Sequence, residues 1–154
     1  MTEPLPEFRR PSAFESSLNR IFGFLVGLGV GPAYNFLLEV RGRKSGKIFA
    51  TPVNLLEMNG KQFLVAPRGR TQWVRNAEAS GEVTLKRGIS RRRFRLRPLA
   101  DTEKPPVLKE YLERFKGAVQ RYFAVPAGSP VAAFTEVAAS YPAFELIGEG
   151  QRSG

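Results

Sequence analysis

Residues 36–66 read FLLEVRGRKSGKIFATPVNLLEMNGKQFLVA, and this stretch decides which class of fold the chain can form. It contains two strand-like segments, 36–41 and 49–58, separated by a glycine-bounded basic loop. Asn59-Gly60 is the dipeptide typical of two-residue type I′ hairpin turns. Residues 62–66 are therefore predicted to run back antiparallel beside the second segment.

The basic loop between the first two segments reads Gly42-Arg43-Lys44-Ser45-Gly46-Lys47. Its two glycines permit tight turns, and its cations, hydroxyl and exposed N–H groups together could hold a phosphate. It is not the phosphate loop of nucleotide triphosphatases, because Ile48 stands where that motif needs Ser or Thr. The alternative is a basic turn that only faces solvent, and the loop alone leaves both interpretations open.

Further strands and helices follow the opening stretch. Pro67-Arg68-Gly69-Arg70 ends the strand before it, and the patterns beyond predict a helix over 72–79, strands over 82–86 and 89–99, a helix over 105–115, a loop-rich stretch over 117–130, a helix over 131–139 and a strand over 143–147. Consecutive antiparallel strands with covering helices predict an α+β domain, most simply a small barrel or roll.

Arginines alternate with apolar residues in the predicted strand 89–99. Side chains alternate across a strand, so one face carries Arg91, Arg93, Arg95 and Arg97, and the other carries Phe94 and Leu96. We expect a solvated outer face whose long stems cover the sheet. A nucleic-acid surface would interleave exposed aromatic residues with the cations. Because Phe94 falls on the opposite face, no nucleic-acid partner is predicted. Contact of this face with a membrane, or a basic nucleic-acid-binding barrel, is the less favoured alternative.

The N-terminal part divides into two segments. Residues 1–12 contain three prolines and are predicted to form a mobile arm, and 13–150 form a single domain. Apolar residues at helical spacing predict an amphipathic helix over 13–28, whose apolar run is too short to cross a bilayer. It would cover an open side of the sheet, or else contact a membrane peripherally or line an apolar pocket. Without a signal-peptide layout, the expected location is cytoplasmic, with membrane association as the alternative.

Composition excludes several kinds of chemistry. The 154 residues include neither Cys nor His, which excludes the usual zinc and copper sites, thiolate-ligated or His-ligated haem, and a Ser-His-Asp triad. No metal site is predicted, and acid or base work would fall to Tyr, Lys, Asp or Glu. A formal charge of +10 favours anionic ligands or an anionic surface.

Further motifs surround the basic loop in a fixed order. They are Leu38-Glu39-Val40-Arg41, Thr51-Pro52-Val53, Phe63-Leu64-Val65-Ala66-Pro67, Trp73-Val74-Arg75-Asn76 and Gly81-Glu82-Val83-Thr84-Leu85. Their order resembles the deazaflavin-dependent nitroreductase and quinone reductase family, oxidoreductases that use coenzyme F420. The likeness spans about 37–99 and reaches more weakly to Phe144-Glu145-Leu146. It implies a six-stranded split β-barrel, an FMN-binding-like roll, and hydride transfer from the deazaflavin C5 to a quinone, nitroaromatic, enone or lipid-like acceptor.

The resemblance also implies a cofactor site. Arg43, Lys44, Ser45 and Gly46 would hold the phosphate and the anionic tail of F420, and Thr51, Pro52 and Val53 would line the deazaflavin ring. Ala66, Pro67 and Arg68 would form the opposite loop, with Arg70 also available to the tail. Trp73 would pack beside the phosphate end, Arg75 would add charge, and Asn76 would brace the loop. Taken alone, Trp73 and Asn76 are equally typical of a helix that only packs on a sheet.

The chain departs from better-known members of that family at two points. They carry an Ala-Ser-Lys-Gly-Gly stretch where this chain has Ala66-Pro67-Arg68-Gly69-Arg70, and Pro67 lacks a backbone donor. Their tyrosine-rich substrate wall is not clearly reproduced, so Tyr34 and Tyr122 are weak candidates for a proton donor, beside solvent. A non-catalytic cofactor- or lipid-binding barrel, an FMN-binding relative, and a monomeric or homodimeric state stay open.

Overall fold

The computed structural model describes residues 33–148, so the predicted arm and the predicted helix over 13–28 lie outside the described residues. One seven-stranded sheet has the strand order β2-β1-β5-β6-β7-β4-β3, with antiparallel pairing throughout. The strands are β1 (Asn35–Arg41), β2 (Ile48–Asn54), β3 (Leu56–Met58), β4 (Lys61–Val65), β5 (Glu82–Arg87), β6 (Ser90–Pro98) and β7 (Ala143–Gly148). The helices are α2 (Gln72–Ser80), α3 (Lys104–Val119), η1 (Gln120–Tyr122), α4 (Val131–Thr135) and η2 (Ala138–Ser140).

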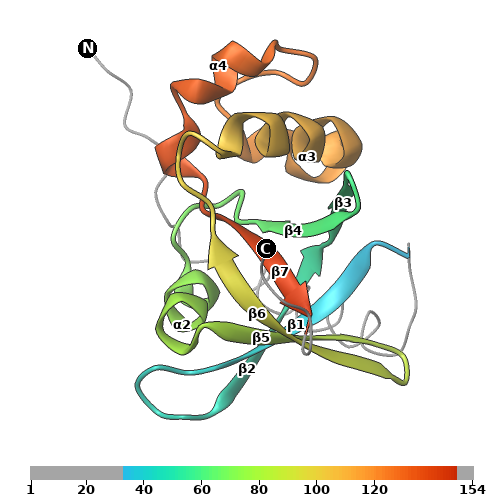
Figure 1. The fold of residues 1–154 in the computed structure, drawn as a ribbon, viewed down its shortest axis with the longest axis vertical. Helices are drawn as coiled ribbons and strands as arrows, with labels where there is room; N and C mark the ends of the chain where they lie inside the picture. The colour runs from blue at the N-terminus through green and yellow to red at the C-terminus, as the bar shows by residue number, and fades with distance from the viewer. Residues whose placement is uncertain (1–32, 149–154) are drawn as a thin grey trace.

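The sheet is curled into a split barrel, because its two edge strands are consecutive in the chain. The prediction of one strand over 49–58 is wrong: Leu55 interrupts it, and its N–H donates a hydrogen bond to the Tyr34 carbonyl at 2.8 Å. Before Leu55 the chain pairs with β1, and after it the chain pairs with β4. The six strands implied by the family resemblance thus become seven, and the two edges of the curled sheet are joined by one residue (Figure 1).

The predicted Asn59-Gly60 turn is confirmed. Both residues have positive φ, 54° and 74°, as a type I′ turn requires, and Met58 and Lys61 pair across it. A second tight turn, Gly88-Ile89, joins β5 to β6, and Gly88 has a φ of 58°. These two turns set the register of the β3–β4 and β5–β6 hairpins.

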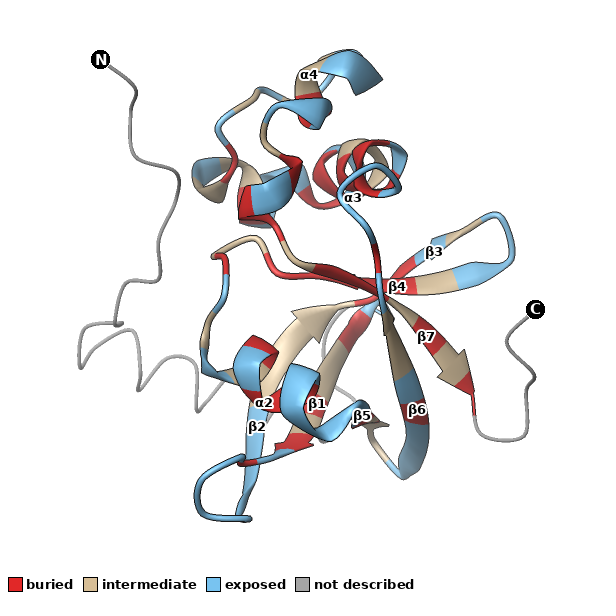
Figure 2. Cartoon of the chain, turned by 60° about the vertical axis from the view of Figure 1, so that its left-hand side comes forward, coloured by how far each residue is buried: buried red, intermediate tan, exposed pale blue. Residues whose placement is uncertain are grey.

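One core lies between the sheet and α3. Leu56, Phe63 and Val65 from β3 and β4 pack against a stripe of α3 side chains that includes Val107, Leu108, Tyr111 and Leu112. Figure 2 shows the buried side of α3 turned toward β4, with α4 stacked beyond it. None of the helices within 33–148 has the length and apolarity needed to cross a membrane.

Two helix boundaries differ from the prediction. α3 continues past 115 to Val119, although Phe115 has non-helical angles, because Phe115 and Val119 are both buried in this core. α4 ends at Thr135 rather than at 139, and the chain then forms the short η2 before β7. The extension of α3 matters for the site, since it brings the following residues up to the barrel.

A second core fills the barrel itself, with Leu38, Val40, Val83, Leu85 and Phe94 among its buried members. The predicted outer face of β6 is confirmed: Phe94 is buried, whereas Arg91, Arg93 and Arg95 are exposed. Two of these arginines are tied to the fold, as Arg91 pairs with Glu39 and Arg97 Nε lies 3.0 Å from Glu145 Oε1. Two of the four arginines on this face, Arg91 and Arg97, therefore take part in ion pairs of the sheet itself.

Candidate functional site

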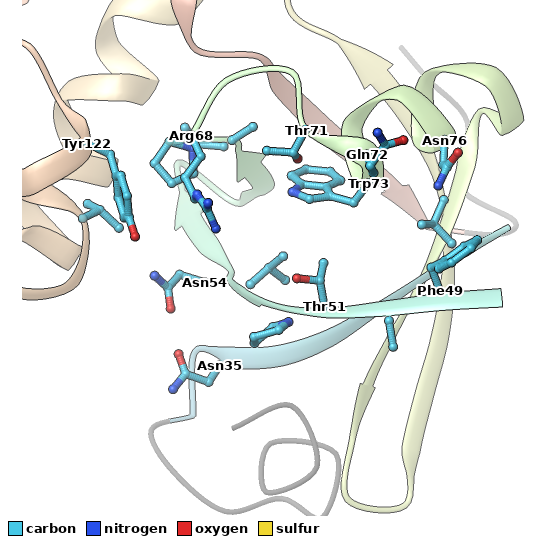
Figure 3. Close-up of a pocket in the computed structure, with 18 of the residues that line it drawn as sticks. Asn35, Phe49, Thr51, Asn54, Arg68, Thr71, Gln72, Trp73, Asn76 and Tyr122 are labelled. Carbon is cyan, nitrogen blue, oxygen red and sulfur yellow. The ribbon is translucent and has the colours of Figure 1, made fainter. Parts of the chain in front are cut away.

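A cavity of about 750 Å³ lies beside the edge strand β2. Its floor is β2, its roof is the loop 66–71 with the start of α2, and residues from α3 and η1 close one end. In Figure 3, Thr51 and Asn54 face Arg68, Thr71 and Trp73 across the cavity, with Tyr122 at one end and Asn76 at the other.

The cavity follows the free edge of β2. Every residue from 49 to 54 borders it, although successive side chains of a strand point to opposite faces of a sheet. Contact with all of them places the cavity along the strand's edge, where β2 has no sheet neighbour. Edge strands present unpaired N–H and C=O groups. The floor can therefore offer backbone hydrogen bonds to the polar rim of a flat ring.

The basic loop is a tight turn that begins where β1 ends. Gly42 N donates to the Lys47 carbonyl at 2.7 Å, and Gly46 N donates to the Gly42 carbonyl at 3.0 Å. Gly46 has a φ of 75°, and a Cβ at Gly42 would lie only 2.6 Å from Phe49 Cε2. Both glycines are needed for this shape, which holds the side chains of 43–45 against the cavity.

Arg43 is held in place by neutral groups. Its Nη1 donates to Asn76 Oδ1 at 2.8 Å and to Gln72 Oε1 at 3.0 Å, and its backbone N donates to Asn76 Oδ1 at 3.1 Å. Asn76 is buried on α2. Between residues 33 and 148 no carboxylate pairs with Arg43 or with Lys44. The guanidinium is thus oriented by two amides that leave its positive charge uncompensated.

The start of α2 adds further donors to the same end. Thr71 is the N-cap residue, and its Oγ1 is buried at the cavity with no hydrogen-bond partner among the described residues. The N–H groups of a helix's first turn have no acceptor inside the helix, and its dipole favours an anion there. Trp73 borders the cavity and packs on Phe144, with ring centroids 6.1 Å apart. This end is built to receive negative charge.

The opposite end is more aromatic. Two guanidiniums lie near the Tyr122 ring, with Arg121 Cζ 4.7 Å and Arg68 Cζ 5.8 Å from its centroid. Tyr141 fixes this segment, because its hydroxyl donates to the Tyr122 carbonyl and accepts from Ala124 N, each at 2.9 Å. The position of Tyr122 at the cavity is therefore set by a buried tyrosine outside it.

A second buried tyrosine borders the same end. Burial raises the pKa of the Tyr111 phenol far above its ordinary value of 10.0, and a side-chain hydrogen bond with Asn54 opposes that shift only in part. The phenol therefore stays protonated at every physiological pH. Tyr34, which is half exposed, contributes a ring 4.8 Å from that of Phe115.

The structure gathers most of the sequence-predicted site residues around this cavity. Arg43, Lys44, Ser45, Thr51, Pro52, Val53, Ala66, Pro67, Arg68, Trp73 and Asn76 line it, as do Tyr34 and Tyr122. Three expected residues do not: Gly46 shapes the loop, Arg75 is exposed on α2, and Arg70 pairs with Glu78 at 2.8 Å.

Several lining residues were missed by sequence reasoning, namely Asn35, Phe49, Asn54, Thr71, Gln72, Tyr111 and Arg121. Thr71 had a usable signal, since Thr directly before a predicted helix is a preferred N-cap. Tyr111 and Arg121 had none, because only the packing of α3 against the barrel brings them here.

Comparisons with known proteins agree with this geometry. The model of a family described as F420H(2)-dependent quinone reductase matches residues 20–124. A protein described as a domain-swapped dimer has a TM-score of 0.52 at 22% identity, covering 86% of this chain and 96% of its own. An F420-H2 dependent reductase, FDR-A, has a TM-score of 0.50 at 22% identity, covering 76% and 96%.

An Agrobacterium tumefaciens protein of unknown function reaches a TM-score of 0.54 at 20% identity, covering 97% of this chain but 58% of its own length. At such identities these structures show a shared fold, the split barrel. No curated protein matches the chain.

Proposed function

Because the chain belongs to the F420H2-dependent quinone reductase family, we propose that its cavity holds coenzyme F420 along β2 and a quinone-like acceptor beside it. The chain is an F420-dependent oxidoreductase. The observation that supports this use of the cavity is the Arg43 guanidinium, which two neutral amides orient and no described carboxylate neutralises.

The residues at the basic end fit a phosphodiester with an anionic tail. Arg43 offers a planar donor pair of the kind that suits phosphate, and Lys44 adds an unpaired charge. The Thr71 hydroxyl is buried and has no hydrogen-bond partner within residues 33–148, so a bound anion would satisfy a group that is otherwise costly to leave unpaired. Arg43, Lys44, Ser45 and Thr71 would together hold the phosphate and the start of the tail.

The middle of the cavity fits a flat ring. Thr51, Pro52 and Val53 line it from the edge of β2, and Trp73 lies on the opposite side (Figure 3). Pro67 also lines the cavity. The strand's unpaired backbone groups would meet the polar rim of the deazaflavin, while the apolar side chains exclude water from its faces. The acceptor would then occupy the aromatic end near Tyr122.

When bound, the reduced deazaflavin supplies a hydride from its C5 to the unsaturated acceptor. A quinone that gains this hydride, with its two electrons, also needs one proton to become a neutral hydroquinone. Tyr122 and Tyr34 border the acceptor end, and either hydroxyl would donate this proton to the quinone. The tyrosine would then be reprotonated from solvent. Tyr111 keeps its proton and would serve as a hydrogen-bond donor or a wall.

The first test is cofactor affinity, measured by titrating F420 into the full chain. Removing one charge-assisted hydrogen bond costs about 1.5–3 kcal/mol, so Arg43→Ala should weaken binding roughly 10- to 150-fold. Lys44→Ala should also weaken it. Arg75→Ala is the matched control, because Arg75 is exposed on α2 away from the cavity. Equal affinity of the Arg43 and Arg75 variants would remove the proposed binding mode.

The second test is turnover. The wild-type protein is mixed with reduced F420 and menadione, and reoxidation of the deazaflavin is followed by its absorbance. We expect saturable reoxidation. Tight F420 binding with no reoxidation by any acceptor would instead assign the cavity to cofactor storage, and a yellow protein with flavin absorbance as purified would assign it to FMN.

A further inference from the structure

The β5–β6 hairpin forms the most strongly basic part of the described surface. Between Val83 and Leu99 the chain has seven cations and no acidic residue. At its turn, Ile89 is 107% exposed, the most exposed large apolar side chain among residues 33–148. Four cations, Lys86, Arg87, Arg91 and Arg92, flank this side chain within three residues of the turn.

The hairpin tip lies beside the acceptor end of the cavity. β5 pairs with β1 so that Lys86 stands opposite Leu37, which brings the turn level with the start of β1. Arg87 Nη1 donates to the Asn35 carbonyl at 2.9 Å, and Asn35 lines the cavity. In Figure 1 this hairpin projects at the lower right, on the opposite side of the molecule from α4.

Two of the four cations at the tip, Lys86 and Arg92, make no ion pair within residues 33–148. Arg92 Cζ lies 5.0 Å from the centroid of the Phe94 ring. Of the other two, Arg91 pairs with Glu39, and Arg87 is held by the fold through contacts that include the Asn35 carbonyl. The tip therefore presents net positive charge around one apolar side chain.

We propose that residues 86–92 dock the enzyme on an anionic lipid bilayer, with Ile89 entering the headgroup region and the flanking cations contacting lipid phosphates and carboxylates. A charged rim around an apolar tip matches such an interface. A nucleic-acid surface would need exposed aromatic residues for stacking, whereas Phe94 is buried. Docking would give the enzyme access to an apolar quinone held in the bilayer, and this use of the surface rests on the proposed function. The binding of the hairpin to anionic lipid does not depend on it.

The test is co-sedimentation of the full chain with vesicles of phosphatidylcholine, alone or mixed with phosphatidylserine. Binding is expected only with the anionic mixture and should weaken as salt is added. Lys86→Gln and Arg92→Gln should each lower the partition coefficient about fivefold, and Ile89→Ser about tenfold. Lys61→Gln and Val131→Ser are matched controls, a lysine and an exposed aliphatic away from this hairpin, and should bind as the wild type does.

The outcomes separate docking from catalysis. Ile89 and Lys86 do not line the cavity, so their variants should still reoxidise F420H2 with menadione at the wild-type rate. Vesicle binding unchanged in the hairpin variants would overturn the proposal even if the enzyme is active. Binding to a duplex oligonucleotide with none to anionic vesicles would overturn it in favour of nucleic acid. If Ile89→Ser unfolds, the two charge variants decide the result.

Discussion

Asn76→Asp should weaken F420 binding without removing any contact to the cofactor. Asn76 Oδ1 is buried and lies 2.8 Å from Arg43 Nη1. Asp has nearly the same shape as Asn, so the substitution places a carboxylate on that guanidinium and neutralises its charge. The Arg43 contact with the cofactor phosphate would lose its charge assistance, worth about 1.5–3 kcal/mol, which corresponds to roughly 10- to 150-fold weaker affinity.

The same substitution should leave the fold intact. The new carboxylate is paired with Arg43 at the site where the amide was, and a paired buried charge is tolerated far better than an isolated one. Isothermal titration with F420 gives the affinity, and urea denaturation gives the free energy of unfolding. The expected pattern is a large loss of affinity at nearly unchanged stability.

Gln72→Glu provides a graded comparison. Gln72 Oε1 accepts from the same guanidinium at 3.0 Å, but this contact is exposed to solvent. Solvent screens an exposed ion pair, so the loss of affinity should be smaller than for Asn76→Asp. If Asn76→Asp binds F420 as tightly as the wild type, the uncompensated charge of Arg43 is not what holds the cofactor.

Three smaller changes test other parts of the site. Thr71→Val removes a buried hydroxyl that has no hydrogen-bond partner within the described part of the chain. The free energy of unfolding in urea should therefore be nearly unchanged, while F420 affinity falls about two- to tenfold. Tyr141→Phe removes hydrogen bonds to Tyr122 and Ala124 and should cost about 1–3 kcal/mol of unfolding free energy in urea. The raised pKa of Tyr111 means that its contribution to stability is complete below pH 10.0 and is lost as the pH rises above it. The free energy of unfolding of Tyr111→Phe, measured in urea, should therefore decrease less steeply than that of the wild type as the pH rises above 10.0.

Each of these has a contrary result. Full F420 affinity in Thr71→Val would show that the hydroxyl finds its partner elsewhere. A Tyr141→Phe protein as stable as the wild type would show that the Tyr122 segment is held by other contacts. If Tyr111→Phe and the wild type lose the same free energy of unfolding as the pH rises, groups other than Tyr111 cause the loss of stability in alkali.

Local signals in the sequence were sufficient for the hairpins and for the basic loop. Asn59-Gly60 specifies its turn through the positive φ of both residues, which depends on nothing distant. The break at Leu55 could not be predicted in this way, because residues 49–58 read as one strand. Only the contact of Leu55 N with the Tyr34 carbonyl shows that this strand changes partners.

The residues of the candidate site also fall into two groups, those that local motifs predicted and those that only tertiary packing brings to the cavity. Arg43, Thr51 and Trp73 belong to motifs that are short in sequence, and the structure places them around one cavity. The acceptor end includes Tyr111 and Arg121, which the chain reaches only after its first six strands and before β7. The position of Arg121 depends on α3 continuing past Gly117 to bury Val119, an effect of tertiary packing that outweighs the glycine.

The single residue that joins β2 to β3 limits where the chain can change its length. Side chains alternate along a strand, so deleting or adding one residue at Leu55 would turn the side chains of either β2 or β3 to the wrong face of the sheet, and Leu56 of β3 packs in the core beneath α3. The loop 42–47 joins two strands at their ends, so its length can change without shifting the register within either strand. A change of length within this loop would therefore affect the binding of the cofactor, whereas a change at Leu55 would affect the closure of the barrel.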